Sequence, residues 1–461
     1  MIGRLFRSGP DGPRVEDPGA VARAFERRRW SVFLSVTFGY GMFYVCRINF
    51  AAAKTPMLDQ GVMDAEQMGV VGSCLLIAYA AGKLVNGFLA DRANIARFLS
   101  TGLLLSAAVN LVLGFGAPFL LFAALWALNG WFQSAGSAPC IVSLSQWFSQ
   151  RERGSRYGIW CISHNLGEGV TFIVTGSLVG ALGWQWGFWG PGLLCLGSAI
   201  VMYRTMSDRP QCYGLPPVSE YKDDPEPPAA AAEPVGRLQA EVLRNPAVWV
   251  LGLASALMYV ARYAMNNWGF VWLEKGKGYA GEDAGTVLAV YAVTGFIGSF
   301  TSGLISDRFF GARRNVLTLA AGVAEIAALY ALFAIPPGNP WLDGIAMAVF
   351  GYSMGILVAF LGGLMAVDIV PPRAAGAAAG VVGMFSYVGA AIQDYVSGRL
   401  IHEGRNVGAD GVTSYSFDGV FAFWIGASVL SAALALLVWN AGRRAPPSVP
   451  AGTRSEHARG R

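Results

Sequence analysis

Two arginines, Arg47 and Arg262, stand inside long apolar stretches of the chain, where charged side chains are unusual. Arg47 follows Arg29 by 18 residues, which is about 27 Å along an α-helix. Arg262 lies 17 residues after Asn245 and 12 before Glu274, far from polar sequence on both sides. A guanidinium group presents a planar fork of N–H donors that can hold two phosphate oxygens. Two such forks could neutralise a phosphomonoester, whose charge approaches −2 above a pKa of about 6.

Arg47 also has an explanation that needs no ligand, whereas Arg262 is harder to explain in this way. Arg47 precedes Lys54 by seven residues and could extend its long side chain to the outer membrane surface. Arg262 has no such exit, and an arginine within a span normally faces a bundle interior or a wet cavity. No acidic residue lies within one helical turn of either arginine. We therefore interpret the pair as a clamp for a dianion, with Arg262 the better supported of the two.

The elements that must position these residues are membrane-spanning helices. The chain has 461 residues, of which 54% are hydrophobic and 14% charged, and its mean hydropathy is +0.45. Apolar blocks of about 20 residues can cross a hydrocarbon core of about 30 Å. We predict an all-α integral membrane protein with twelve transmembrane helices, at 31–52, 66–88, 97–117, 119–146, 156–182, 185–205, 246–272, 284–305, 314–336, 341–365, 374–400 and 416–441.

A polar, proline-rich break divides the twelve spans into two sets of six. Its composition, which includes Pro225-Glu226-Pro227-Pro228, predicts a flexible linker in water. Lys and Arg gather on the side that carries the break, so the positive-inside rule places the linker and both termini in the cytoplasm. The predicted parts are a cytoplasmic N-terminal segment (1–30), an N-terminal half (31–205), the linker (206–245), a C-terminal half (246–441) and a cytoplasmic tail (442–461). The few basic residues assigned to the outer loops are chiefly Lys54, Lys275, Lys277, Arg399 and Arg405.

The halves share an internal repeat. A Gly-x-x-x-Asp-Arg motif follows the second span and recurs 216 residues later, after the eighth, while Arg47 and Arg262 are 215 residues apart. Two unrelated features whose offsets differ by a single residue indicate pseudo-symmetric halves with a site between them, an arrangement that suits alternating access. The charged motif residues could latch one conformational state, although simple turn chemistry also fits; they are Asp91, Arg92, Asp307 and Arg308.

Further polar residues within the spans could join the arginines. His164 is the one histidine deep in a span, and could titrate near neutral pH or donate to a carbonyl in a packed core. Glu168 lies four residues on, on the same helical face, and could hold a protonated His164 or repel phosphate. Lys83 could face a pore or extend to the cytoplasmic surface.

Three other charged residues are placed by span length near helix ends. Asp394 and Arg399 could select part of a substrate, but a solvated outer mouth is their expected surroundings. Glu325 is expected to be structural.

These motifs resemble those of a known family of carriers. The Gly-x-x-x-Asp-Arg loops resemble the major facilitator superfamily. The stretches 39–50, 163–167, 259–263 and 208–217 resemble the organophosphate:phosphate antiporters within it, and the resemblance runs from Arg29 to Arg444. It implies the major facilitator fold and a substrate site made of Arg47, Arg262, His164, Lys83, Tyr40, Tyr44, Tyr259 and Tyr387.

The chain departs from that family pattern at positions that bear on substrate choice. Ile48 stands where a lysine is expected, Glu168 where a glycine is expected, and Ala292 where a glutamate is expected. Hexose 6-phosphate, glycerol 3-phosphate and a phosphoglycerate all fit two arginines.

The expected function is exchange of a phosphorylated organic anion for inorganic phosphate by alternating access, in a bacterial inner membrane. We expect a monomer that needs no cofactor or metal and binds no nucleic acid. A membrane receptor that senses extracellular hexose phosphate for a partner kinase is the alternative, and it fits the same residues. A membrane enzyme is disfavoured, because no nucleophile–base pair or paired intramembrane carboxylates can be read from the sequence.

Overall fold

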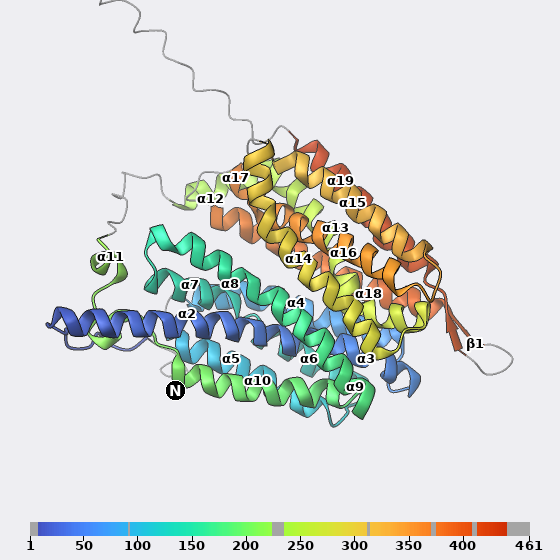
Figure 1. Ribbon diagram of the computed structural model, residues 1–461, viewed down its shortest axis with the longest axis horizontal. Coiled ribbons are helices and arrows are strands. Elements are labelled where there is room, and N and C mark those ends of the chain that lie inside the picture. Colours follow the sequence, from blue (N-terminus) through green and yellow to red (C-terminus); the bar gives the residue numbers. More distant parts are fainter. Residues whose placement is uncertain are drawn as a thin grey trace, which may run out of the picture.

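The computed structural model describes residues 8–90, 93–223, 235–310, 314–369, 375–407 and 413–439. Within these residues the chain is almost wholly helical. The described strands are β1 (Arg405–Val407) and β2 (Thr413–Tyr415), which pair antiparallel with Asn406 opposite Ser414. This hairpin lies at one end of the molecule (Figure 1).

The N-terminal half is a set of helices that fill the first six predicted spans. Asp17 caps the first of them by accepting from the backbone N–H groups of Gly19 and Ala20, and Pro18 occupies its first position. The helices are α2 (Pro18–Ile48) with α3 (Phe50–Asp59), α4 (Ala65–Ala90), α5 (Ile95–Leu113), α6 (Phe119–Gln133) with α7 (Ser137–Trp147), α8 (Gln150–Val170) continued through the π-helical η1 (Thr171–Thr175) into α9 (Gly176–Leu182), and α10 (Trp186–Thr205).

The C-terminal half fills the remaining six predicted spans in the same order. Asn245 caps its first helix through the backbone N–H of Ala247. The helices are α13 (Pro246–Val271) with the π-helical η3 (Trp272–Gly276), α14 (Gly281–Phe310), α15 (Arg314–Ala334), α16 (Pro340–Ala359) with η4 (Phe360–Leu364) and α17 (Met365–Asp368), α18 (Ala375–Glu403) and α19 (Asp418–Leu437).

Helices occupy all twelve predicted places, so the predicted all-α membrane fold is confirmed. Ten helices among the described residues are long and apolar enough to cross a membrane. The two places outside that set are the fourth, where residues 134–136 separate α6 from α7, and the eleventh, α18. α18 is less apolar because its buried face carries polar residues, among them Ser386, Gln393 and Asp394.

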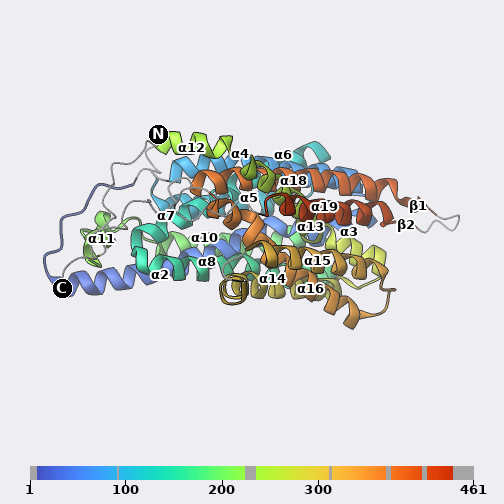
Figure 2. The same cartoon turned by 90° about the horizontal axis from the view of Figure 1, so that it is seen from above.

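The two halves lie beside each other and come together toward the end that carries the hairpin (Figure 1), and Figure 2 shows the same helices from above. Helices of the two halves meet at α4 with α18, at α8 and its continuation α9 with α14, and at α3 with α13. Glycines allow the closest approach. A Cβ added to Gly398 of α18 would lie 2.4 Å from the carbonyl oxygen of Ala65 of α4, so neither helix could come as near with a larger residue there. Contact between the halves is therefore tight at the end that carries the hairpin.

The first part of the linker folds against the N-terminal segment. The linker contains η2 (Pro210–Tyr213), α11 (Val218–Tyr221) and α12 (Val235–Arg244). The backbone N–H of Gly12 donates to Gln211 O at 2.9 Å. The Asp208 carboxylate accepts from Ser8 Oγ at 2.6 Å and from the backbone N–H of Ile95 at 3.2 Å. These bonds hold the linker against the N-terminal segment and against the start of α5.

Candidate substrate site

Arg47 is buried near the end of α2 and turns into the molecule. Its side chain is 4% exposed, so it does not extend to the outer surface. The guanidinium carbon lies 4.4 Å from the ring centres of both Tyr44 and Tyr79, and each contact contributes about 0.5–2 kcal/mol. Nε donates to Gln133 Oε1 at 3.2 Å. Neither Nη atom has a hydrogen-bond partner among the described residues, so this N–H edge of the guanidinium group is unpaired there.

A buried amide network fixes Gln133 in the orientation that serves Arg47. Gln133 Nε2 donates to Ser106 Oγ at 2.7 Å, and that hydroxyl donates to Asn129 Oδ1 at 2.6 Å. Asn129 Nδ2 in turn donates to the carbonyl oxygen of Cys46 at 2.8 Å. Because the Gln133 amide nitrogen donates to Ser106, the amide oxygen of Gln133 must point the other way, toward the guanidinium group of Arg47.

Arg262 sits in the middle of α13 and is paired with a carboxylate from the other half. It is 7% exposed, and its Nη2 lies 3.2 Å from Oε1 of Glu168, which is 1% exposed. Asn266 Nδ2 donates to the same oxygen at 3.3 Å. Glu168 comes from α8, 94 residues away in sequence. The Glu168 carboxylate therefore pairs with Arg262. This contact differs from both roles suggested for Glu168 from the sequence, which were to hold a protonated His164 or to repel phosphate.

A group of tyrosines connects the two arginines. The ring centre of Tyr387 lies 4.7 Å from that of Tyr79, which contacts Arg47, and 5.8 Å from that of Tyr259, which contacts Arg262. Tyr263 extends this group, because its ring centre lies 5.7 Å from that of Tyr259. The two cations thus face one aromatic cluster built from both halves.

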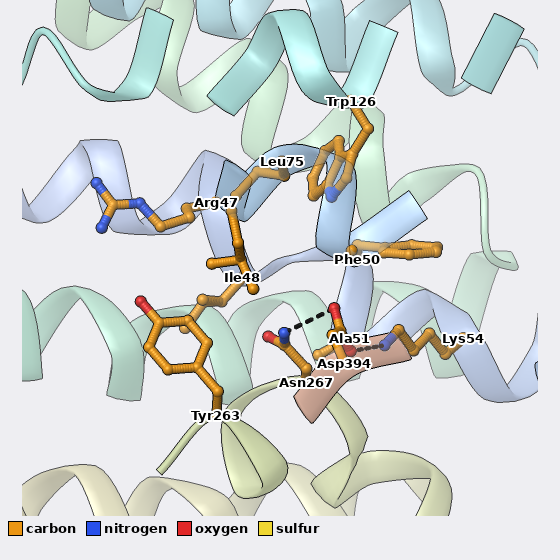
Figure 3. Close-up of a pocket in the computed structure, with 12 residues that line it drawn as sticks. Arg47, Ile48, Phe50, Ala51, Lys54, Leu75, Trp126, Tyr263, Asn267 and Asp394 are labelled. Atoms are coloured by element: carbon orange, nitrogen blue, oxygen red, sulfur yellow. Dashed lines mark hydrogen bonds and ion pairs between the residues drawn. The ribbon is translucent and has the colours of Figure 1, made fainter. Parts of the chain in front are cut away.

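Two cavities open beside the arginines. One is lined by Arg47, Ile48, Phe50, Ala51, Lys54, Gly72, Leu75, Leu76, Trp126, Tyr263, Asn267 and Asp394. Figure 3 shows Arg47 at one side of this cavity and Asp394 held between Asn267 and Lys54 on the other. The second is lined by His164, Asn165, Arg262, Tyr291, Gly295, Ser299, Gly351, Met354, Gly355 and Val358.

The placements expected for Lys54 and Asp394 are wrong. Lys54 is 1% exposed and Asp394 0%, and Lys54 Nζ lies 3.4 Å from Asp394 Oδ1. Asp394 also accepts from Trp268 Nε1 at 2.5 Å and from Asn267 Nδ2 at 3.0 Å. The span-length estimate failed because α3 continues to Asp59 and α18 to Glu403, which moves the outer ends beyond both residues.

One other placement also needs correction. Glu325 lies in the middle of α15 rather than near its end; it is 2% exposed and accepts from Ser428 Oγ at 2.8 Å. Lys277 lies between η3 and α14, in the connection where it was expected, and its buried Nζ lies 2.8 Å from Asp343 Oδ1. Arg399, by contrast, is exposed and pairs with Glu403, as a solvated mouth requires.

The remaining predicted site residues lie around the arginines at different depths. His164 lines the Arg262 cavity, and its ring centre is 5.7 Å from that of Tyr44. Lys83 Nζ lies 5.2 Å from the ring centre of Tyr387, which extends the cationic group toward α4. Tyr40 packs between Tyr44 and Trp160, with ring-centre distances of 5.6 Å and 4.7 Å.

The four motif residues proposed as a latch are mostly beyond what the structure describes. Asp91 and Arg92 lie outside the described residues, as does the side chain of Asp307. Arg308 is exposed at the end of α14. Their role stays a prediction.

Sequence reasoning missed several residues that hold the arginines. Tyr79 stands four residues before Lys83 and thus on the same helical face, which was an available signal. Asn129 and Gln133 show the same spacing in a strongly apolar span, and buried amides there call for partners. The Glu168–Arg262 pair had no such local signal.

Comparisons with known proteins agree with this architecture. The family model described as Major Facilitator Superfamily matches residues 32–393. The chain is 32% identical to a glycerol-3-phosphate transporter of Bacillus subtilis, over 96% of this chain and 99% of that protein. It is 30% identical to the membrane sensor protein UhpC of Salmonella typhimurium, over 95% and 97%.

A solved structure shares the fold at much lower identity. It is a bacterial homologue of the human lysosomal transporter Spinster, in an inward-facing and unoccupied conformation. The TM-score is 0.74 at 16% identity, and the match covers 91% of this chain and 99% of that one. With the family model matching most of the spans and two full-length relatives at 30% identity or more, this chain belongs to the major facilitator superfamily, within its organophosphate:phosphate antiporter family.

Proposed function

We propose that this protein exchanges a phosphorylated organic anion for inorganic phosphate across a bacterial inner membrane by alternating access. The linker and both termini are placed in the cytoplasm by the positive-inside rule. The observation that carries the proposal is Arg47, a buried guanidinium group whose two Nη atoms have no hydrogen-bond partner among the described residues. An oxoanion with two adjacent oxygens would satisfy both at once.

The energetic argument favours a charged ligand over a neutral one. An uncompensated buried charge costs several kcal/mol, and hydrogen bonds to charged groups contribute about 1.5–3 kcal/mol each. Contacts with Tyr44 and Tyr79 offset part of the cost but leave the N–H edge of Arg47 open. A phosphate group bound there and shared with Arg262 would offset the rest.

The wall of the Arg47 cavity offers polar partners for the organic part of an ester. This wall carries Asn267, Lys54 and Asp394 on the side away from the Arg47 guanidinium group (Figure 3), and their polar atoms suit the hydroxyl groups of a phosphorylated sugar or glycerol. Apolar side chains such as Leu75 and Trp126 form the rest of the wall (Figure 3). Hexose 6-phosphate, glycerol 3-phosphate and a phosphoglycerate remain the candidate substrates.

The site also suits a rocking mechanism. Arg47 belongs to one half and Arg262 to the other, so a bound phosphate would attach to both. The halves are packed closely where Gly398 meets Ala65 at the hairpin end. Substrate would then enter and leave from the opposite end in this conformation, and rocking about the site would open the hairpin end.

Transport by purified protein in lipid vesicles tests the proposal. Vesicles loaded with labelled phosphate should release it when glycerol 3-phosphate, glucose 6-phosphate or a phosphoglycerate is supplied outside. The substitution Arg262→Lys should reduce this exchange. Wild-type vesicles that exchange phosphate for none of these esters would contradict the proposal, and unchanged exchange by Arg262→Lys would refute the clamp.

A second candidate function is sensing, and the 30% identity to a membrane sensor protein favours keeping it. A receptor would bind phosphate esters with the same residues but would not need to move them across the membrane. Purified protein that binds glucose 6-phosphate, yet shows no phosphate exchange in vesicles, would support the receptor.

A further inference from the structure

The two arginines of the site are compensated in different ways. Arg47 Nε faces the neutral amide oxygen of Gln133 at 3.2 Å. Arg262 Nη2 faces the carboxylate of Glu168 at the same distance, 3.2 Å, with Glu168 1% exposed. One guanidinium group therefore awaits an anion, whereas the other already has one supplied by the chain.

Glu168 occupies the position that a substrate oxygen would take on Arg262. Carboxylate and phosphate both present oxygens to the same N–H edge of a guanidinium group, so they compete for it. Phosphate that binds Arg262 must displace Glu168 Oε1 or share Nη2 with it. A displaced Glu168 retains Asn266 Nδ2, 3.3 Å away, as a donor.

The pair lies at the depth where rocking moves residues least. Arg262 is in the middle of the helix that runs from Pro246 to Gly276, and Glu168 is in the middle of the one from Gln150 to Leu182. These helices come from opposite halves. A contact at mid-depth can persist while the two ends open and close in turn, so Glu168 can stay with Arg262 in both orientations.

We propose that Glu168 is an internal counter-anion, which compensates Arg262 when no phosphate is bound and lets the empty carrier change orientation. This rests on the proposed exchange function. If neither arginine had a counter-charge, the empty carrier would have to enclose two unpaired charges in order to change orientation. The free-energy cost of burying them would oppose that change, so the carrier would change orientation only with an anion bound. Here Glu168 removes one of those charges. The protein then performs exchange together with net, one-way movement of phosphate or its ester.

Phosphate efflux from vesicles separates the two modes of transport. Vesicles are loaded with labelled inorganic phosphate, and release is measured into anion-free buffer and into buffer with saturating unlabelled phosphate. For the wild type, the rate without external phosphate should be within about tenfold of the exchange rate. In Glu168→Gln the exchange persists, while the ratio of one-way efflux to exchange falls at least tenfold. Unchanged ratios in Glu168→Gln would overturn the proposal.

Two further variants make the result specific. Glu168→Asp keeps the charge and should retain more of the one-way efflux than Glu168→Gln does. Glu325→Gln is a matched control, because it also removes a buried carboxylate but one that contacts Ser428, away from the site; its efflux ratio should equal that of the wild type. A ratio that falls equally in Glu325→Gln would also overturn the proposal.

Equilibrium binding provides a readout that does not depend on transport. Without the competing carboxylate, Glu168→Gln in detergent should bind inorganic phosphate at least tenfold more tightly than the wild type, measured by titration calorimetry. If Glu168→Gln does not fold, Glu168→Ala takes its place in both measurements. Weaker or equal phosphate binding by the neutral variant would contradict competition. Failure of all exchange in the wild type would instead refute the proposed function.

Discussion

Glu168 and Arg262 form an ion pair between the two halves of the protein, with 3.2 Å between Oε1 and Nη2. The equivalent arginine in the first half, Arg47, has the uncharged Gln133 in that role. The internal repeat in the sequence therefore places two arginines at matching positions but gives them unlike partners. An anion that binds between them meets an open fork on one side and an occupied one on the other.

The neutral partner of Arg47 leads to the first prediction. Gln133→Glu places a carboxylate 3.2 Å from Nε of Arg47 and gives both arginines an internal counter-charge. Phosphate must then displace two carboxylates, and its affinity should fall at least tenfold, or about 1.4 kcal/mol. Calorimetry in detergent measures the affinity. Gln133→Met is the control for loss of the hydrogen bond alone, and tighter binding by Gln133→Glu would contradict the prediction.

The second prediction compares lysine substitutions at the two arginines. Arg47→Lys removes a fork whose Nη atoms are open, and should weaken phosphate binding by about 1.5–3 kcal/mol, the contribution of a charged hydrogen bond. Arg262→Lys should weaken it less, because a lysine can still pair with Glu168 and the native fork is already partly used. Dissociation constants for inorganic phosphate decide the order. A larger loss for Arg262→Lys would show that Arg262 is the main phosphate ligand.

The fold and the two arginines could be predicted from the sequence because each depends on a local rule. Apolar blocks long enough to span a membrane identify helices, and a charge inside such a block is conspicuous. The partner of Arg262 depends on which helices of opposite halves meet, and Glu168 is 94 residues away. Lys54 was misplaced for a related reason. After Asn49 a further helix, α3, continues the span outward, so Lys54 lies within the span. A hydropathy pattern does not show which carboxylate pairs with Lys54.

The third prediction concerns the buried pair of Lys54 and Asp394. Lys54→Met leaves the Asp394 carboxylate buried with Trp268 and Asn267 as donors but no counter-charge. Loss of one partner of a buried pair costs about 3–5 kcal/mol. Adding Asp394→Asn should recover part of that loss. Thermal unfolding of the purified proteins measures both, and a double variant less stable than Lys54→Met would contradict the pairing.

The last prediction uses the close packing of α4 against α18. A Cβ on Gly72 would lie 1.5 Å from Asp394 Oδ2, and that carboxylate is held by Trp268 and Asn267. Gly72→Ala should therefore force the hairpin ends of the halves apart and favour the opposite orientation. Spin labels at two exposed sites, Val62 in the first half and Val407 in the second, should report a longer distance in the variant once the native cysteines are replaced. Gly197→Ala is the control, since its added Cβ meets no atom within 4 Å. Because alanine at an unhindered helix position stabilises by about 0.5–1 kcal/mol, the control should keep the native label distance and lose no stability. An unchanged distance in Gly72→Ala would show that contact between these helices does not hold the hairpin end closed.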